Sequence, residues 1–188
     1  GWVYPTVFDK FSTLRTKQND PAATEYVFNL QKNILFKGKT RVENGSFEFM
    51  FKVPLDINYS FGPGKISYYA ENGVIDANGF EEITVGGSEN KCEETQGPVI
   101  SLYINDDKFM NGSVVGANPT VYAKLADESG INLSGAGIGH DLMVSLKGPL
   151  NEEYIVNDFY LADPGSYQSG TLSYPLRKLP AGDYSLSL

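Results

Sequence analysis

The feature that most constrains the fold is an alternating run, residues 47–53, that directly follows an Asn44-Gly45 pair. Phe stands at the first, third and fifth positions of the run and Val at the seventh, with Glu, Met and Lys between them. Successive side chains of a β-strand point to opposite faces, so the run predicts a strand with a buried aromatic face. Asn-Gly supplies the positive φ angles of a tight hairpin turn. We therefore expect a sheet packed against a second sheet, with Phe49 buried between them.

The composition extends this prediction to the whole chain of 188 residues. Twelve Tyr, eleven Phe, twenty Gly and ten Pro, against only three Met, favour pleated strands joined by tight turns. No window shows the apolar spacing of three and four residues that marks an amphipathic helix. The chain is therefore predicted to be all-β. Besides residues 47–53, the predicted strands are residues 2–8, 11–18, 26–28, 34–42, 65–70, 80–85, 98–104, 121–126, 142–146, 170–176 and 184–188.

Pro5 lies in the middle of the first predicted strand. Proline has no backbone N–H and cannot donate to a neighbouring strand. We therefore expect residues 2–8 to form an edge strand or to contain a bulge.

A polar segment near the middle of the chain predicts two domains. Residues 86–97 have glycines at both ends and no periodicity, which is typical of a linker. The predicted division is a β-sandwich module over residues 1–88, a linker over residues 89–96 and a second β-sandwich module over residues 97–188.

The last ten residues suggest the type of the second module. Leu179, Gly182, Tyr184 and Leu186 follow the spacing of the tyrosine corner in immunoglobulin-like sandwiches. A simple alternation with a Gly-Asp turn would give a similar pattern. If Tyr184 marks the corner, the module lacks its last strand, and we expect the exposed edge to associate with another copy or to be shielded by the terminal segment.

The net charge of −8 and the pI near 4.6 argue against a nucleic-acid partner, because phosphate binding needs clustered Lys and Arg. Most of the negative excess lies in residues 89–188, where a solvated acidic surface is the favoured interpretation and a basic partner is the alternative. No apolar run approaches the roughly twenty residues of a membrane span.

The sequence contains one Cys and one His, Cys92 and His140, and Asp141 follows the histidine. These are the residue types of a cysteine peptidase. However, Cys92 lies in the predicted linker beside Glu93 and Glu94, whose charges disfavour a thiolate. We therefore expect no catalytic pair here, and no disulfide within the chain.

Metal sites find limited support. Zinc needs three or four converging ligands, and one His with one Cys do not supply them. Calcium, which binds oxygen ligands, is left open at acidic loop tips. The candidate tips are Asp76-Ala77-Asn78-Gly79, Asn105-Asp106-Asp107 and Asn157-Asp158. No cofactor is expected.

Two pairs of adjacent aromatic residues, Tyr68-Tyr69 and Phe159-Tyr160, bear on sugar binding. In a strand, each pair should place one ring in the core and the other outward. Outward rings could stack on sugars, although sandwiches often carry such rings without a ligand.

Several short segments of the chain resemble those of a known protein family. In residues 1–88 they are residues 5–10, 33–39, 47–49, 54–59 and 64–70, and in residues 97–188 they are residues 97–98, 127–132, 157–160 and 174–176. Two more specific motifs are Gly137, Ile138, Gly139, His140 and Asp141, and Tyr167, Gln168, Ser169 and Gly170. Together these segments resemble the region after the peptidase domain in PorU-like, gingipain-related (C25-type) cysteine peptidases of the type IX secretion system.

The resemblance implies a non-catalytic accessory region of a longer surface peptidase. The catalytic Cys and His of that family belong to an upstream domain, so no catalytic, cofactor-binding or metal-binding residue is carried over to this chain. It further implies an extracytoplasmic, cell-surface location, with the upstream peptidase domain and secretion-system proteins as partners. The modules would then position substrate or dock the enzyme during the processing of sorting signals. A free-standing adhesin or glycan-binding pair is the alternative, and an autonomous enzyme comes third.

Overall fold

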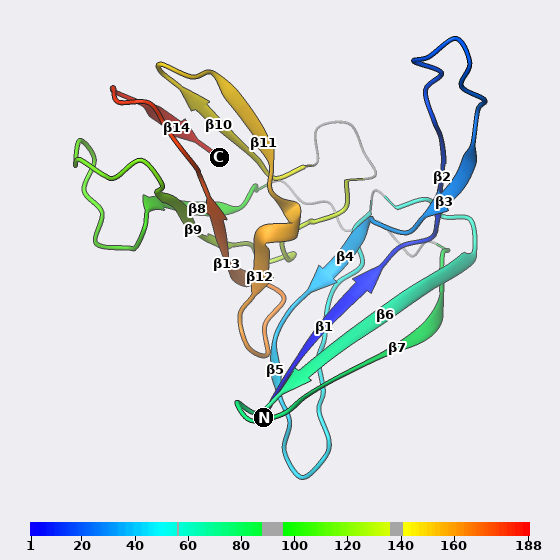
Figure 1. The fold of residues 1–188 in the computed structure, drawn as a ribbon. Helices are drawn as coiled ribbons and strands as arrows, with labels where there is room; N and C mark the ends of the chain where they lie inside the picture. The colour runs from blue at the N-terminus through cyan, green and yellow to red at the C-terminus, as the bar shows by residue number, and fades with distance from the viewer. Residues whose placement is uncertain (56, 88–95, 136–140) are drawn as a thin grey trace.

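A computed structural model describes residues 1–55, 57–87, 96–135 and 141–188 of the chain (Figure 1). Regular structure within these residues is β-strand, apart from one 3-10 turn, η1 (Asn157–Phe159). The strands form several antiparallel sheets, which confirms the prediction of an all-β protein built from sandwich modules. None of the described residues belongs to a helix that is long and apolar enough to cross a membrane.

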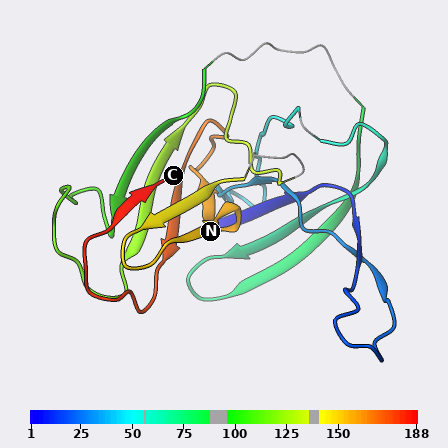
Figure 2. The same cartoon turned by 90° about the horizontal axis from the view of Figure 1, so that it is seen from above.

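The early part of the chain forms an antiparallel sheet with the strand order β4-β1-β6-β7, and β5 also pairs with β1. Its strands are β1 (Trp2–Phe8), β4 (Ile34–Lys37), β5 (Thr40–Arg41), β6 (Gly62–Glu71) and β7 (Asp76–Val85). Burial alternates along β1, where Val3, Pro5 and Val7 face the core. β2 (Ser12–Arg15) and β3 (Val27–Leu30) form a separate hairpin that stands away from this sheet in both Figure 1 and Figure 2.

β7 is a free edge of the first sheet. It pairs with β6 along all 10 of its residues, and no other described strand pairs with it. Its first seven residues are exposed on both faces of the sheet, and three of the ten are acidic: Asp76, Glu81 and Glu82. Residues 76–79, predicted as a calcium loop tip, therefore lie in a strand, and that prediction of a loop is wrong.

The alternating run at residues 47–53 is not a strand, so this prediction is wrong. The turn before it is present: Asn44 and Gly45 have φ angles of +52° and +80°, and Glu43 and Ser46 form an isolated bridge. Beyond the bridge the backbone leaves the sheet, and the aromatic rings stack on Phe36 instead. Phe49 and Phe51 are half-buried, with ring centroids 5.8 and 5.3 Å from that of Phe36. The alternation of apolar and polar residues shows which side of the segment packs against the protein. Here that side is covered by ring stacking, and the backbone pairs with no described strand.

Pro5 is not on an edge strand, because β1 pairs with β6 on one side and with β4 and β5 on the other. Pro5 lies opposite the gap between β4 and β5, so the N–H that proline lacks has no strand partner to lose. There the N–H of Gly38 donates to the Pro5 carbonyl over 3.1 Å. An interruption in the partner strands thus makes an internal proline tolerable. The expected irregularity lies two residues further on, as a register shift between Val7 and Phe8.

The late part of the chain forms two antiparallel sheets, with strand orders β12-β13-β9-β8 and β11-β10-β14. Their inward residues share one core, which includes Val121, Leu125, Val144 and Leu172. The strands are β8 (Val99–Ile104), β9 (Thr120–Ala126), β10 (Met143–Lys147), β11 (Glu152–Ile155), β12 (Tyr160–Ala162), β13 (Ser169–Pro175) and β14 (Ser185–Ser187). The strands predicted here are present, and β11 and β12 were not predicted.

Tyr184 makes a hydrogen bond to the backbone just upstream of it, as the predicted tyrosine corner requires. Its hydroxyl donates to the carbonyl oxygen of Pro180, four residues upstream, over 3.0 Å. β14, the strand that follows, pairs with β10 on one side, and within the described residues no strand pairs with its other side.

The two parts of the chain pack against each other along β4. Ile34, Leu35 and Phe36 are all buried, and the same cluster of buried residues continues into the late part of the chain. The Lys37 ammonium donates to the carbonyl oxygen of Asp158 in η1. Burial lowers the pKa of Lys37, and the charge of Asp158 opposes that shift. Most of the predicted linker, residues 89–95, lies outside the described residues.

Candidate functional site

The Tyr167–Gly170 motif, at the start of β13, holds the loop formed by residues 127–135. The backbone carbonyl oxygen of Gln168 accepts a hydrogen bond from the N–H of Asp127, over 2.8 Å. Its side-chain amide donates to the carbonyl oxygen of Glu128, over 2.7 Å. The backbone and the side chain of one glutamine thus hold two successive residues of the loop.

Tyr167 packs against the same loop at Gly130. Gly130 has a φ of +91°, a conformation that side chains with a Cβ rarely adopt. A Cβ at this position would also lie 2.9 Å from the Tyr167 ring. The glycine is therefore required both by the backbone turn and by the close approach of the tyrosine.

Ser169 and Gly170 complete the motif with structural contacts. The Ser169 hydroxyl donates to the carboxylate of Asp163 over 2.7 Å, and the Ser169 carbonyl oxygen accepts a hydrogen bond from the N–H of Asp163. A Cβ on Gly170 would lie 2.4 Å from the Tyr160 hydroxyl and 2.5 Å from the Leu161 carbonyl oxygen. No side chain fits there, because Tyr160 lies across the strand at this point.

Tyr160 is an unusual core residue. Its side chain is buried, and its hydroxyl has no hydrogen-bond partner among the described residues. Burial raises the pKa of the phenol, and the charge of Asp163 adds to the shift. The hydroxyl therefore stays protonated, with no visible role in chemistry.

The other motif is described only at Asp141, since Gly137, Ile138, Gly139 and His140 lie outside the described residues. Asp141 accepts a hydrogen bond from the side-chain amide of Asn157, over 2.9 Å. The same amide nitrogen of Asn157 also donates to the carbonyl oxygen of Leu133. The side-chain oxygen of Asn157 accepts a hydrogen bond from the N–H of Leu142. Asn157, which is 8% exposed, thus joins both ends of the segment that contains the motif.

Asn157 was predicted only as a calcium candidate, and sequence reasoning missed this structural role. The signal was available in the sequence as an Asn between apolar residues and an aromatic pair. A buried amide needs partners for all of its polar atoms, and a nearby loop backbone can supply them. Asn157 and the Tyr167–Gly170 motif hold different parts of residues 127–142, and no described contact joins the two motifs directly.

The remaining candidate chemical groups are dispersed or already occupied. Cys92 lies outside the described residues, as does His140. Asp107 pairs with Lys124 over 2.7 Å, and this hydrogen bond lowers the pKa of the carboxyl group. The Asp106 carboxylate accepts the N–H of Lys108. Within the part of the chain that the structure describes, no three His, Cys, Asp or Glu side chains converge as metal ligands would.

The adjacent aromatic residues lie as predicted. Tyr160 is buried, whereas Phe159 is 41% exposed and packs edge-on against Tyr174. Tyr68 packs edge-on against Phe49 on the inner face of the first sheet. Tyr69 points outward, 45% exposed.

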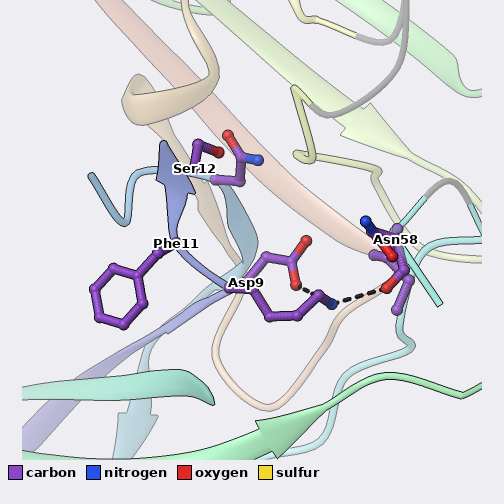
Figure 3. A pocket seen from close by; sticks show the side chains of 7 residues that line it. Asp9, Phe11, Ser12 and Asn58 are labelled. Atoms are coloured by element: carbon purple, nitrogen blue, oxygen red, sulfur yellow. Dashed lines mark hydrogen bonds and ion pairs between the residues drawn. The ribbon is translucent and has the colours of Figure 1, made fainter. Parts of the chain in front are cut away.

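A polar cavity of about 390 Å³ lies where β1 ends and the β2–β3 hairpin begins (Figure 3). Asp9 and Lys10 lie in its wall, and the Lys10 ammonium contacts the Asp9 carboxylate over 2.8 Å. The same ammonium donates to the carbonyl oxygen of Asn58, also over 2.8 Å. Asp9 is 4% exposed, so this ion pair is largely removed from solvent.

Backbone contacts fix the position of this ion pair. The N–H of Asp9 donates to the Asn33 carbonyl, and its own carbonyl accepts the side-chain amide of Gln31. The Lys10 stem passes over Gly62, where a Cβ would lie 2.7 Å from the lysine Cδ. Sequence reasoning missed this cavity because three separate segments of the chain form it.

Comparison with protein-family models finds no match for this chain, and comparison with curated proteins finds none either. Among solved structures, the chain is similar to dimeric latent PorU from Porphyromonas gingivalis, with 28% sequence identity and a TM-score of 0.44. The similarity covers 99% of this chain and 18% of that one, so the chain spans less than a fifth of the length of that protein.

Proposed function

We propose that the chain forms non-catalytic accessory modules of a PorU-like, gingipain-related cysteine peptidase. In this role the modules act at the cell surface, outside the cytoplasm. They position substrate, or dock the peptidase domain to the secretion machinery, while sorting signals are processed in type IX secretion. The partners are the upstream peptidase domain and proteins of the secretion system.

One observation carries the proposal: the described residues of both resemblance motifs make structural contacts. Gln168 holds residues 127 and 128, Asp141 is held by Asn157, and Ser169 bonds Asp163 in the turn before β13. Gln168 and Asn157 carry no titratable group, and the Ser169–Asp163 pair closes the turn between β12 and β13 together with backbone hydrogen bonds. A motif that shapes a loop is suited to presenting a surface to a partner.

The strand orders support an immunoglobulin-like assignment for the late sandwich. In chain order, β8, β9, β12 and β13 take the positions of strands A, B, D and E, and β10 and β14 take those of C and F. The hydroxyl of Tyr184 makes the corner bond immediately before β14. We include this fold in the proposal, because such modules commonly serve as spacers and contact surfaces.

The test uses the full-length parent peptidase on cells. Asn157→Ala releases both ends of the loop segment, and Gln168→Ala releases residues 127 and 128. We expect these variants to impair removal of sorting signals from secreted cargo while hydrolysis of a short peptide substrate stays unchanged. Asp107→Ala, which breaks an exposed ion pair on another loop, serves as the matched control.

Two outcomes would contradict the proposal. Equal loss of short-peptide hydrolysis and cargo processing would place these residues in catalysis or in general folding, and circular dichroism of the purified variants separates those two causes. Thiol-dependent peptide cleavage by the purified 188-residue chain, abolished by Cys92→Ser, would make the chain itself an enzyme.

A further inference from the structure

We propose that the cavity at Asp9 and Lys10 binds a saccharide unit. This inference is independent of the accessory role, since it concerns the early sheet and not residues 127–142. It assigns a ligand class to a site built by the end of β1, the start of the hairpin and residues 57–58 (Figure 3).

The ion pair itself is the first argument. Removing two charges from water is costly, and well-packed apolar residues would usually stabilise a fold equally well or better. The Lys10 and Asp9 side chains are 14% and 5% exposed, and both line an open cavity. A buried pair that faces a cavity is therefore better explained by a ligand than by stability.

Unused hydrogen-bonding atoms are the second argument. The second carboxylate oxygen of Asp9 has no partner among the described residues, and Figure 3 shows it directed away from Lys10. The side-chain oxygen of Asn58 accepts the N–H of Ser60, which leaves its amide N–H groups unused within the described residues. Ser12 and Asn33 add a hydroxyl and a second amide to the lining. Both donors and acceptors thus line the cavity.

The mixture of groups selects the ligand chemistry. A cation would meet the Lys10 ammonium and an anion the Asp9 carboxylate, so a charged ligand gains little. An apolar ligand would leave these polar atoms without partners, at a cost in free energy. Adjacent hydroxyl groups of a sugar can donate to a carboxylate and accept from an ammonium or amide at the same time.

An exposed aromatic ring lies beside the cavity. Phe11 also lines the cavity and is 51% exposed. Its ring points away from Asp9 and Asn58 (Figure 3), so it meets a ligand that extends out of the cavity. The face of a pyranose ring carries C–H groups that pack on aromatic rings, while its hydroxyl groups reach outward. The carboxylate and the amides of the cavity suit the hydroxyl groups of a sugar, and the exposed ring beside the cavity suits its C–H face.

The test is nuclear magnetic resonance titration of the purified chain with methyl glycosides of common hexoses and N-acetylhexosamines. We expect at least one glycoside to shift the backbone signals of residues 9–12 and 57–58. Phe11→Ala should weaken that binding about tenfold, a change of about 1.4 kcal/mol. Phe11 is largely exposed, so the variant should fold. Tyr26→Ala, which removes an exposed ring elsewhere on the hairpin, should leave binding unchanged.

Asp9→Asn keeps the shape of the side chain but removes its charge, and it should also weaken binding. Two results would overturn the proposal: no glycoside shifts these signals, or Phe11→Ala leaves the shifts unchanged. Binding of a trialanine peptide at the cavity without binding of any glycoside would make it a peptide site instead. Since this assay measures ligand binding by the isolated chain, its failure is distinguishable from failure of the cargo-processing test.

Discussion

At the scale of single residues, Gly170 and Tyr160 depend on each other. The glycine leaves room for a ring whose hydroxyl would otherwise clash with a Cβ on the facing strand. The ring fills the core, while its hydroxyl stays without a partner among the described residues. Its apolar part stabilises the sandwich, and its polar end costs free energy.

Tyr160→Phe is therefore expected to stabilise the chain by about 1 kcal/mol, because it removes a buried, unpaired hydroxyl and keeps the ring. Tyr184→Phe provides the matched comparison. It deletes a hydroxyl that is bonded to the Pro180 carbonyl, and should destabilise the chain by about 1 kcal/mol. Urea denaturation of both variants measures these changes. A loss of stability in Tyr160→Phe would show that its hydroxyl has a partner in solution.

At the scale of elements, the sequence predicted strands well where apolar residues face a sandwich core. β1, β8, β9, β10 and β13 lie close to their predicted bounds. Residues 47–53 carry the clearest alternation and yet form no strand. Periodicity shows which side of a segment is covered, whereas a strand also needs a neighbouring backbone to pair with. β12, with three residues, is too short to show periodicity.

Phe49→Ala tests this distinction. A fully buried Phe→Ala change costs roughly 3–5 kcal/mol, and the half-buried ring of Phe49 should cost about 2 kcal/mol. The cost arises from lost stacking on Phe36 and edge contact with Tyr68. Urea denaturation provides the measurement, with the more exposed Phe47→Ala as control. Equal costs for the two variants would show that Phe49 does not contribute to the core.

The candidate sites were less predictable than the strands. The Asp9 cavity combines residues 9–12, 33 and 57–58, which become neighbours only through the fold. The two motifs were identified by their resemblance to a family, and no local pattern shows which residues they contact. Asn157, which holds Asp141 of one motif, has partners 16 and 24 residues away in the chain. Contacts over such separations depend on the strand topology, which local patterns do not determine.

At the scale of the whole molecule, the continuous core along β4 should couple the two parts of the chain. Trp2, the only tryptophan, lies in β1 and reports on the early sheet. We expect Leu125→Ala, in the core of the late sandwich, to lower the urea midpoint reported by Trp2 fluorescence. The exposed variant Tyr26→Ala should leave it unchanged. If Leu125→Ala leaves the urea midpoint of Trp2 fluorescence unchanged, the two parts unfold independently.

Lys37, at the contact between the two parts, should make stability depend on pH. Its pKa in the folded state lies below the ordinary 10.5, so the unfolded chain binds more protons between the two values. The cost of burying the charged amine is present at neutral pH and is lost as the pH rises towards 10.5.

The wild type should therefore gain stability relative to Lys37→Met as the pH rises through that window. Urea denaturation from neutral pH up to 10.5 measures the difference. Lys32→Met, at an exposed position, should show no such trend. A difference between wild type and Lys37→Met that stays constant with pH would refute the proposed role of burial.

The free edge at β7 has a consequence for handling the protein. Its unpaired backbone groups could template a strand from another molecule, and ionised Asp76, Glu81 and Glu82 oppose this by mutual repulsion. Near the pI of 4.6 the chain loses its net charge, and with it the repulsion between whole molecules. Molecules can then approach closely enough for their β7 edges to meet. Mild acid is therefore the condition under which this chain should form sheet-to-sheet aggregates while still folded.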